Sequence, residues 1–190
     1  METADSSRTV RNRTWPATLV IFLILAAVVL GGYFTAGLLS VPEGSPITVG
    51  GLARVTPLSG WEVARKGGEG GVSFVRLTRG NGNLDVFAAT FEGDDVGLLR
   101  RYVADRLDPE ARELTVSEDL EQFRLDSGLE GVRVSYLGTF GDVGAPVEGQ
   151  LTAVVAPSGT GVIFDGWSAE GLYGFVAGDV DEMIRAAEVS

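Results

Sequence analysis

The first forty residues carry a different pattern of hydrophobic and polar positions from the rest of the chain. Between Thr14 and Pro42 no residue is charged, whereas charged residues recur at short intervals afterwards. At about 1.5 Å of rise per residue, the apolar run at 16–39 makes a helix of roughly 36 Å. The hydrocarbon core of a bilayer is about 30 Å thick. The pattern therefore predicts one membrane-spanning helix.

The charges that flank this run predict its orientation. Arg8, Arg11 and Arg13 precede it, and the first basic residue after it is Arg54. Because basic residues favour the cytoplasmic side, we expect residues 1–15 to form a cytoplasmic tail and the remainder to lie outside the cytoplasmic membrane. The alternative is a cleaved secretory signal, which has a shorter apolar region of about 7–15 residues and a small-x-small cleavage site.

Beyond the apolar run, Pro, Gly and Ser residues predict a linker at 40–50. The rest of the chain, 51–190, is long enough for one domain with a core of its own. Short strands are expected at Leu52–Pro57 and Trp61–Arg65. A hairpin is expected at Val72–Arg79 and Leu84–Glu92, where an Asn-Gly turn signal joins the two strands.

Alternation along the second strand of this hairpin places Phe87, Ala89 and Phe91 on one face, which we assign to the core. Helical spacing follows from Val96 to Leu107, with Pro109 as the expected end of that helix.

The second half of the domain alternates apolar and polar residues more regularly. Weaker strand patterns around 113–117 and 122–125 lead to a strand that begins near Val132. Two further strands at Val147–Ala156 and Val162–Trp167 follow after short turns. Such turns predict an antiparallel meander, since parallel neighbours need long crossovers. Helical spacing then returns, with Asp179 and Glu182 in the pattern of a capping box.

These elements together predict an α+β fold: one transmembrane helix, then an antiparallel sheet of about six strands packed with two main helices.

Composition narrows the chemistry available to this fold. Histidine and cysteine are both absent, which excludes Ser-His-Asp triads, thiol nucleophiles, disulfides and thiolate zinc sites. From Ser40 onward the chain holds twelve basic and twenty-four acidic residues, a formal charge of −12. Such a charge repels phosphate backbones, so we expect no nucleic-acid partner. The expected partners are the lipid bilayer and a membrane or envelope protein.

Candidate sites are few. Glu92, Asp94 and Asp95 form a carboxylate cluster, but acidic residues at a helix start are explained by the helix dipole. We therefore predict no metal site, no cofactor and no catalytic residues. The large amphipathic side chains Trp61, Trp167 and Tyr173 are candidates for contact with a ligand or partner. The competing interpretation is that they complete a small core.

The order of these elements, the Ser59-Gly60-Trp61 opening and the amphipathic C-terminal helix ending in Asp181-Glu-Met-Ile184 resemble the PsbP-like superfamily, in particular its actinobacterial LpqN-type extracytoplasmic proteins. The resemblance implies a fold, an exported location and a non-enzymatic accessory or binding role. It supplies no catalytic residues to transfer to this chain.

Three hypotheses about function follow. The first is a membrane-anchored, non-catalytic interaction or accessory module of the bacterial cell envelope. The second is a carrier or sensor domain that binds a lipid or small apolar ligand between the sheet and a helix. The third is a hydrolase based on two facing carboxylates, which leave no spacing signature in the sequence.

Overall fold

The computed structural model describes residues 44–141 and 145–190. The predicted cytoplasmic tail at 1–15 and the predicted membrane helix at 16–39 lie outside these residues. Within them, no helix combines the length and the apolar character needed to cross a bilayer. The chain divides into two units, 1–40 and 41–190, and the fold described below is that of the second.

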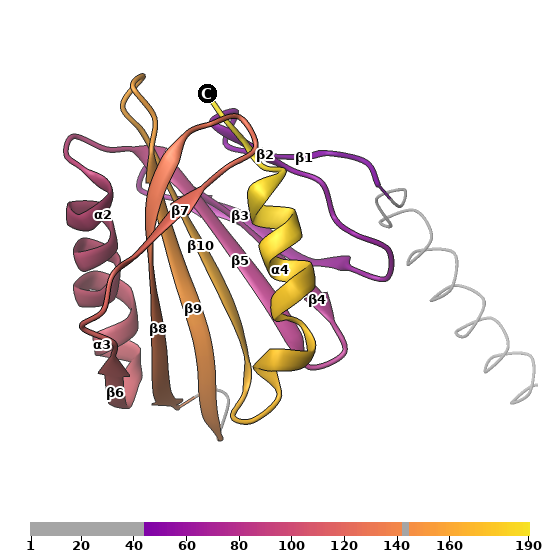
Figure 1. Ribbon diagram of the computed structural model, residues 1–190, viewed down its shortest axis with the longest axis vertical. Helices are drawn as coiled ribbons and strands as arrows, with labels where there is room; N and C mark the ends of the chain where they lie inside the picture. The colour runs from indigo at the N-terminus through magenta and orange to yellow at the C-terminus, as the bar shows by residue number, and fades with distance from the viewer. Residues whose placement is uncertain (1–43, 142–144) are drawn as a thin grey trace, which may run out of the picture. The chain divides into compact units, whose positions relative to one another are not determined.

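The domain is built on one large antiparallel sheet whose strands follow the order β3-β4-β5-β10-β9-β8-β6, with β7 paired to the other half of β8 (Figure 1). The run β8, β9 and β10 is the predicted meander, and β4 with β5 is the predicted hairpin. The bounds are β3 Glu62–Glu69, β4 Val72–Arg79, β5 Gly82–Thr90, β6 Ala111–Val116, β7 Glu121–Arg124, β8 Glu130–Phe140, β9 Pro146–Val155 and β10 Thr160–Ala169.

A second, small sheet joins the two ends of the domain. It has the order β1-β2-β11, with β1 at Ile47–Val49, β2 at Ala53–Val55 and β11 at Glu188–Val189. Residues 47–49, at the end of the expected linker, thus belong to the packed domain. The described residues hold eleven strands rather than about six. The short strand β2 lies within the strand expected at Leu52–Pro57, and β6 and β7 correspond to the weaker patterns around 113–117 and 122–125. The strands β1 and β11 span too few residues to show alternation.

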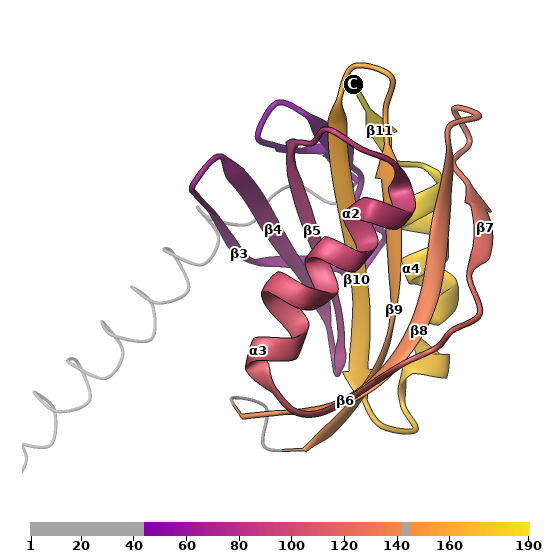
Figure 2. The ribbon, with the colours of Figure 1, turned by 90° about the vertical axis from the view of Figure 1, so that its left-hand side faces the viewer.

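Helices cover both faces of the large sheet (Figures 1 and 2). The segment formed by α2, the π-helical turn η1 and α3 lies on one face, and α4 lies on the other, preceded by the short 3-10 turn η2. We call these the α2 face and the α4 face. The bounds are α2 Asp95–Tyr102, η1 Val103–Leu107, α3 Asp108–Glu110, η2 Tyr173–Phe175 and α4 Ala177–Arg185.

Each face of the sheet has its own hydrophobic core. On the α4 face, Val180, Met183 and Ile184 of α4 pack on fully buried residues of β4, β5 and β10. On the α2 face, Leu99 and Leu107 pack on β8, β9 and β10. The α4 core is closed, whereas α2 covers β8, β9 and β10 more than it covers β4 and β5. The α+β class is confirmed, and the sheet is a central layer between two helical layers.

The face of β5 assigned to the core is the less deeply buried of its two apolar faces: Phe87 packs against the core of the α2 face but stays half-buried. Leu84, Val86 and Ala88 point into the α4 core and are 0%, 0% and 1% exposed. Phe87 and Ala89 lie on the opposite face and are half-buried. Both faces of β5 carry apolar residues, because one packs in the α4 core and the other lies partly beside the α2 core, so alternation alone does not identify the deeper one.

Both predicted helix boundaries also differ from the structure. The first helix continues past Pro109 to Glu110, because Pro109 stands in the first turn of α3, where a missing N–H is tolerated. The last helix starts at Ala177 rather than at Asp179. The carboxylate of Asp179 is engaged elsewhere, accepting hydrogen bonds from Trp61 and Arg79.

Two of the three residues in the acidic cluster at the start of the first helix have structural roles. Asp94 caps α2 by accepting a hydrogen bond of 2.7 Å from the Gly97 amide. Asp95 accepts one of 2.5 Å from the amide of Val155, which fastens the start of α2 to the end of β9.

Candidate functional site

The α2 face of the sheet carries a row of charged side chains across three neighbouring strands. Arg76 on β4 stands opposite Asp85 on β5, and Asp85 stands opposite Asp165 on β10. The two aspartates are 4% and 3% exposed. Carboxylates are seldom buried this deeply unless they are paired, so the partners of each decide what the row can do.

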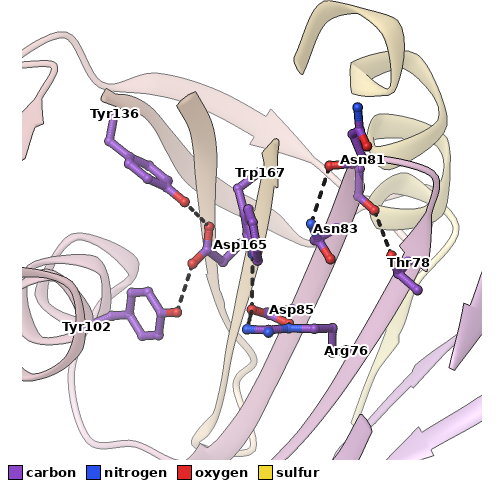
Figure 3. Close-up of polar contacts among 10 residues, drawn as sticks. Arg76, Thr78, Asn81, Asn83, Asp85, Tyr102, Tyr136, Asp165 and Trp167 are labelled. Atoms are coloured by element: carbon purple, nitrogen blue, oxygen red, sulfur yellow. Dashed lines mark hydrogen bonds and ion pairs between the residues drawn. The ribbon is translucent and has the colours of Figure 1, made fainter. Parts of the chain in front are cut away.

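The negative charge of Asp85 is paired with a neighbouring arginine. Its two carboxylate oxygens accept hydrogen bonds from Arg76, 2.6 Å from Nε and 2.7 Å from Nη2 (Figure 3). The indole Nε1 of Trp167 donates a third bond to Asp85 at 3.2 Å. The guanidinium of Arg76 also lies over the Trp167 ring, 5.2 Å from its centroid. This bidentate geometry is a strong form of ion pair.

Asp165 is held by two hydroxyl groups instead of a cation. Tyr136 of β8 and Tyr102 of α2 donate hydrogen bonds to its two oxygens, at 2.8 and 3.0 Å, and converge on it from two sides (Figure 3). Burial raises the pKa of Asp165 to about 7, and the nearby Asp85 carboxylate adds to the increase. The two tyrosine hydroxyls and Arg76 act in the opposite direction.

The two tyrosines remain protonated donors over the whole range in which Asp165 titrates. Burial, first of all, raises the pKa of each hydroxyl well above its usual value, and the Asp165 carboxylate raises it further. A proton on Asp165 would therefore add a donor to a group that already accepts two.

A glycine makes room for one of these tyrosines. Gly149 on β9 lies between Tyr136 and Trp167 in the strand register. A Cβ atom at this position would lie 2.6 Å from Cζ of Tyr136 and 2.7 Å from the backbone oxygen of Gly166. The absence of a side chain at Gly149 lets the Tyr136 ring lean across β9 and reach Asp165.

Two adjoining hollows open onto this row. The first, which we call the polar recess, has a volume of about 70 Å³ and is lined by both aspartates, Arg76, Tyr102, Tyr136 and Trp167. The second, the apolar cleft, has a volume of about 480 Å³. Phe87, Tyr102 and Arg106 line both hollows, so the recess adjoins the cleft.

The apolar cleft lies where α2 leaves β5 uncovered. Its floor is formed by Phe87, Ala89 and Ile163, one wall by α2 and η1, and the other by the tip of the β3–β4 hairpin at Gly70 and Gly71. Figure 2 shows α2 and this hairpin on two sides of β5 and β10. A volume of several hundred Å³ with an apolar floor and a few polar groups at one end is typical of small-molecule sites.

Aromatic rings and arginines form the boundary between cleft and recess. The Phe87 ring stacks on Phe74 with 5.8 Å between centroids and tilts against Tyr102 at 5.3 Å. The guanidinium of Arg106 lies over Phe87, 5.1 Å from its centroid. The boundary therefore offers π faces that already accept cations.

Another hollow, of about 490 Å³, lies on the other side of α2, between the helix and the residues that follow β6. It is lined by apolar side chains such as Val96 and Val103 and by surface charges such as Arg100 and Glu118. The buried polar row lies in the walls of the polar recess, which makes the cleft and its recess the stronger candidate.

The three aromatic candidates from the sequence do not share one groove. Trp167 lines the polar recess. Trp61 is 6% exposed in the core of the α4 face, where its Nε1 donates a 2.9 Å hydrogen bond to Asp179. Tyr173 also lies on the α4 face, with its hydroxyl next to Gly166. Its backbone N–H donates to Glu148 at 2.7 Å, and burial raises the pKa of its side chain. Contact of these three with a ligand or partner stays a prediction.

The buried polar cluster on the α4 face is structural. Arg133, 6% exposed, forms an ion pair of 2.8 Å with Asp181 and a 2.9 Å hydrogen bond with Thr152. Its guanidinium also lies 4.0 Å from the centroid of Phe123. This cluster fixes α4 and β7 to the sheet.

None of the three residues in this row of charged side chains was among the candidates predicted from the sequence. Asp85 stands inside an apolar strand segment, and Asp165 stands between Phe164 and Gly166 in another. A carboxylate within a strand that is covered on both faces is the signal that would have found them. Tyr136 lies in the strand that was expected to begin near Val132, but the partner of its hydroxyl on another strand has no signature in the sequence.

Comparison with known proteins shows the fold. The sequence matches no protein-family model and no curated protein. Among solved structures, the chain is similar to cyanobacterial PsbP (CyanoP) from Synechocystis, with a TM-score of 0.52 and 18% identity over 73% of this chain and 86% of the other. It is also similar to LpqN, a protein involved in cell envelope biogenesis of Mycobacterium tuberculosis, with a TM-score of 0.51 and 12% identity over 80% and 89%. The predicted resemblance to PsbP-like and LpqN-type proteins is confirmed at the level of fold.

Proposed function

We propose that this chain, with its PsbP-like fold, is a non-catalytic binding module of the cell envelope that holds a small amphipathic ligand in the apolar cleft. The observation that carries the proposal is the 480 Å³ cleft with an apolar floor, which adjoins the polar recess. Of the sequence hypotheses, the carrier or sensor domain required a cavity of this size between sheet and helix. The likeness to LpqN supports a place in the envelope.

The remaining parts of the proposal come from the sequence. The apolar run at 16–39 would anchor the domain to the outer side of the cytoplasmic membrane. In that position the domain would receive its ligand from, or present it to, a membrane or envelope protein partner. The acidic character of the domain disfavours nucleic acid as that partner.

The experiment is to identify what the full chain carries. We expect native mass spectrometry of the chain, purified from membranes of its source organism, to show a small molecule bound to the folded protein. Ala89→Phe places a large ring on the cleft floor and should remove the bound mass. Ala64→Phe makes the same substitution at an exposed position of β3 and should leave it unchanged.

Two results would contradict the proposal. One is a bound mass that survives Ala89→Phe in a folded protein. The other is a chain that carries no small molecule but is recovered, after cross-linking, in a complex that Ala89→Phe does not disturb. The second result would favour the interaction-module hypothesis without a ligand.

The polar recess also bears on the hydrolase hypothesis, because Asp85 and Asp165 face one hollow and the pKa of Asp165 is raised to about 7, as in a general acid. We place hydrolysis second. All four carboxylate oxygens already accept hydrogen bonds within the chain, and a 70 Å³ recess is small for a scissile bond with groups on both sides. Release of nitrophenol from nitrophenyl glycosides by the wild type but not by Asp165→Asn would favour it.

A further inference from the structure

The walls of the polar recess carry an unequal number of positive and negative groups. Two guanidinium groups, Arg76 and Arg106, face three carboxyl groups, Asp85, Glu110 and Asp165. When all are ionised the recess has a net charge of −1. A cation of charge +1 would make it neutral, whereas an anion would bring it to −2 in a region partly closed to water.

The excess negative charge belongs to Asp165. Asp85 is paired with Arg76 through two hydrogen bonds, whereas Asp165 accepts its hydrogen bonds from two neutral hydroxyls. A buried carboxylate without a cation is costly, and the group responds by taking up a proton. A ligand that brings a positive charge would replace that proton.

We propose that the apolar cleft binds an alkylamine in its protonated form, with the ammonium group in the polar recess at Asp165 and the hydrocarbon chain along the cleft floor. This inference rests on the proposed binding function and names its ligand class. The recess volume of about 70 Å³ admits a group the size of an ammonium, since a water molecule occupies about 30 Å³. The ammonium donates hydrogen bonds, which suits a site where carboxylates accept.

The aromatic boundary supports a cationic head group. Arg76 lies over Trp167 and Arg106 lies over Phe87, so the rings of this wall already stabilise positive charge. The domain as a whole is acidic, and its field raises the local concentration of cations near its surface.

Binding of the ammonium is linked to a proton on Asp165. The titratable and charged groups that line the recess around Asp165 are Tyr136 of β8, Tyr102 of α2, Asp85 of β5, Arg76 of β4, Arg106 of η1 and Glu110 of α3. Below pH 7 the carboxyl group binds a proton, which the ammonium must displace. Affinity for an alkylammonium should therefore rise about tenfold per pH unit up to about pH 7 and level above it, while the amine itself stays charged below about pH 10.

The test compares three probes with one tail and three head groups: octylammonium, 1-octanol and octanoate. Titration calorimetry uses the full chain in phosphatidylcholine nanodiscs, with empty nanodiscs as the blank. At pH 7.5 we expect octylammonium to bind at least about tenfold more tightly than octanol, and octanoate to bind most weakly. Between pH 5 and pH 7 octylammonium binding should release a proton, measured in buffers of different ionisation enthalpy.

Two variants separate charge from shape. Asp165→Asn should remove the preference for octylammonium over octanol and leave octanol affinity within about twofold. If Asp165→Asn does not fold, Arg106→Gln serves instead. It removes a like charge at the entrance to the recess, so octylammonium should bind several-fold more tightly, octanoate more weakly and octanol equally.

The outcomes distinguish the two proposals. If octanol binds as tightly as octylammonium, or if octylammonium affinity does not change with pH, the amine inference is wrong and the binding function stands. If octanoate binds most tightly, the cleft takes an anionic amphiphile and the amine inference is likewise wrong. If none of the three probes displaces a molecule from the cleft or binds in it, the proposed binding function loses its support as well.

Discussion

At the residue scale, Asp165 is a carboxyl group that the fold shields almost completely from water. It lies in the middle of the large sheet, 3% exposed, beside another carboxylate and under two tyrosine rings. The two hydroxyls donate one hydrogen bond to each oxygen of Asp165 without neutralising its charge, and each oxygen can accept another. The hydrogen bonds to Asp165 are thus well formed, but its surroundings disfavour the charged form. The loss of folding stability that Asp165 causes therefore depends on pH.

We predict that the stability cost of Asp165 appears as pH rises. Because the pKa is raised from 3.8 to about 7, the folded state binds a proton that the unfolded state has released. Stability is therefore lost between about pH 4 and pH 7, by an amount on the order of 4 kcal/mol. Asp165→Asn does not titrate, so its free energy of unfolding, measured by urea denaturation, should gain on that of the wild type over this range.

The contrary result would be a difference between the two proteins that is constant from pH 4 to pH 8. Such a result would mean that Asp165 ionises as easily in the folded state as in the unfolded one. Other carboxylates titrate in both proteins, so their contributions cancel in the difference.

Gly149 gives a second prediction at this scale. Gly149→Ala would bring its Cβ to 2.6 Å from the Tyr136 ring and 2.7 Å from a backbone oxygen. We expect a loss of about 1–3 kcal/mol in the free energy of unfolding, because the ring must leave its position over β9. Gly178→Ala is the matched control, since its Cβ would meet nothing within 4 Å in the first turn of α4. That change should be neutral or stabilising by up to about 1 kcal/mol.

At the scale of elements, the pairing of β4, β5 and β10 sets the charges in a line. The register places Arg76, Asp85 and Asp165 side by side, so a change at one affects the next. Asp85 separates the arginine from the second aspartate and carries the ion pair. Removal of Arg76 therefore takes the cation away from Asp85, whereas removal of Asp85 takes this carboxylate away from Arg76.

We predict an asymmetry between the two partners of this pair. Arg76→Gln leaves Asp85 buried, 5% exposed, next to another carboxyl group, and should cost about 3–5 kcal/mol. Asp85→Asn leaves Arg76, whose side chain is 37% exposed, within reach of water and should cost less. Urea denaturation at pH 7 measures both. An equal loss in the two variants would contradict the burial argument.

Asp85→Asn should also lower the pKa of Asp165, because the Asp85 carboxylate is one of the causes that raise it. The side-chain carboxyl signal of Asp165, followed by NMR across pH, reports this directly. A pKa unchanged in Asp85→Asn would show that burial alone sets the value.

The sequence predicted which helices and strands form better than it predicted which face of each is buried and where each one ends. The β4–β5 hairpin, the meander and the two helical regions follow from local periodicity, and all are present. The turn of the hairpin is one residue earlier than the Asn-Gly signal suggested: Gly80 and Asn81 form it, with a positive φ of 57° at Gly80, and Gly82 is already in β5. Such details depend on tertiary pairing, which leaves no local pattern.

The site was less predictable for the same reason. Tyr102 and Asp165 are 63 residues apart in the chain and meet because α2 packs across the meander. Trp167 was chosen for its size and does line the recess, whereas Trp61 was chosen on the same grounds and fills the other core. Residue type identified large amphipathic side chains, but the face on which each lies is decided by the fold.

At the scale of the whole domain, the two faces of the sheet have different roles. The α4 face has a hydrophobic core under α4, beside which the buried Arg133 pairs with Asp181 and Thr152. The α2 face has a core under the helix and a cleft beside it. Stability can therefore rest on one face while the other keeps a cavity, a division that suits a binding domain.

The small sheet has a mechanical consequence. The described chain enters the domain at β1, and the last residues return to pair with β2, where the Ser190 amide donates to the Leu52 oxygen at 3.0 Å. A pull applied through the start of the domain is therefore taken first by three short strands. The strands that carry the polar row lie in the other sheet. Tension on the chain would fray the small sheet before it reached the cleft.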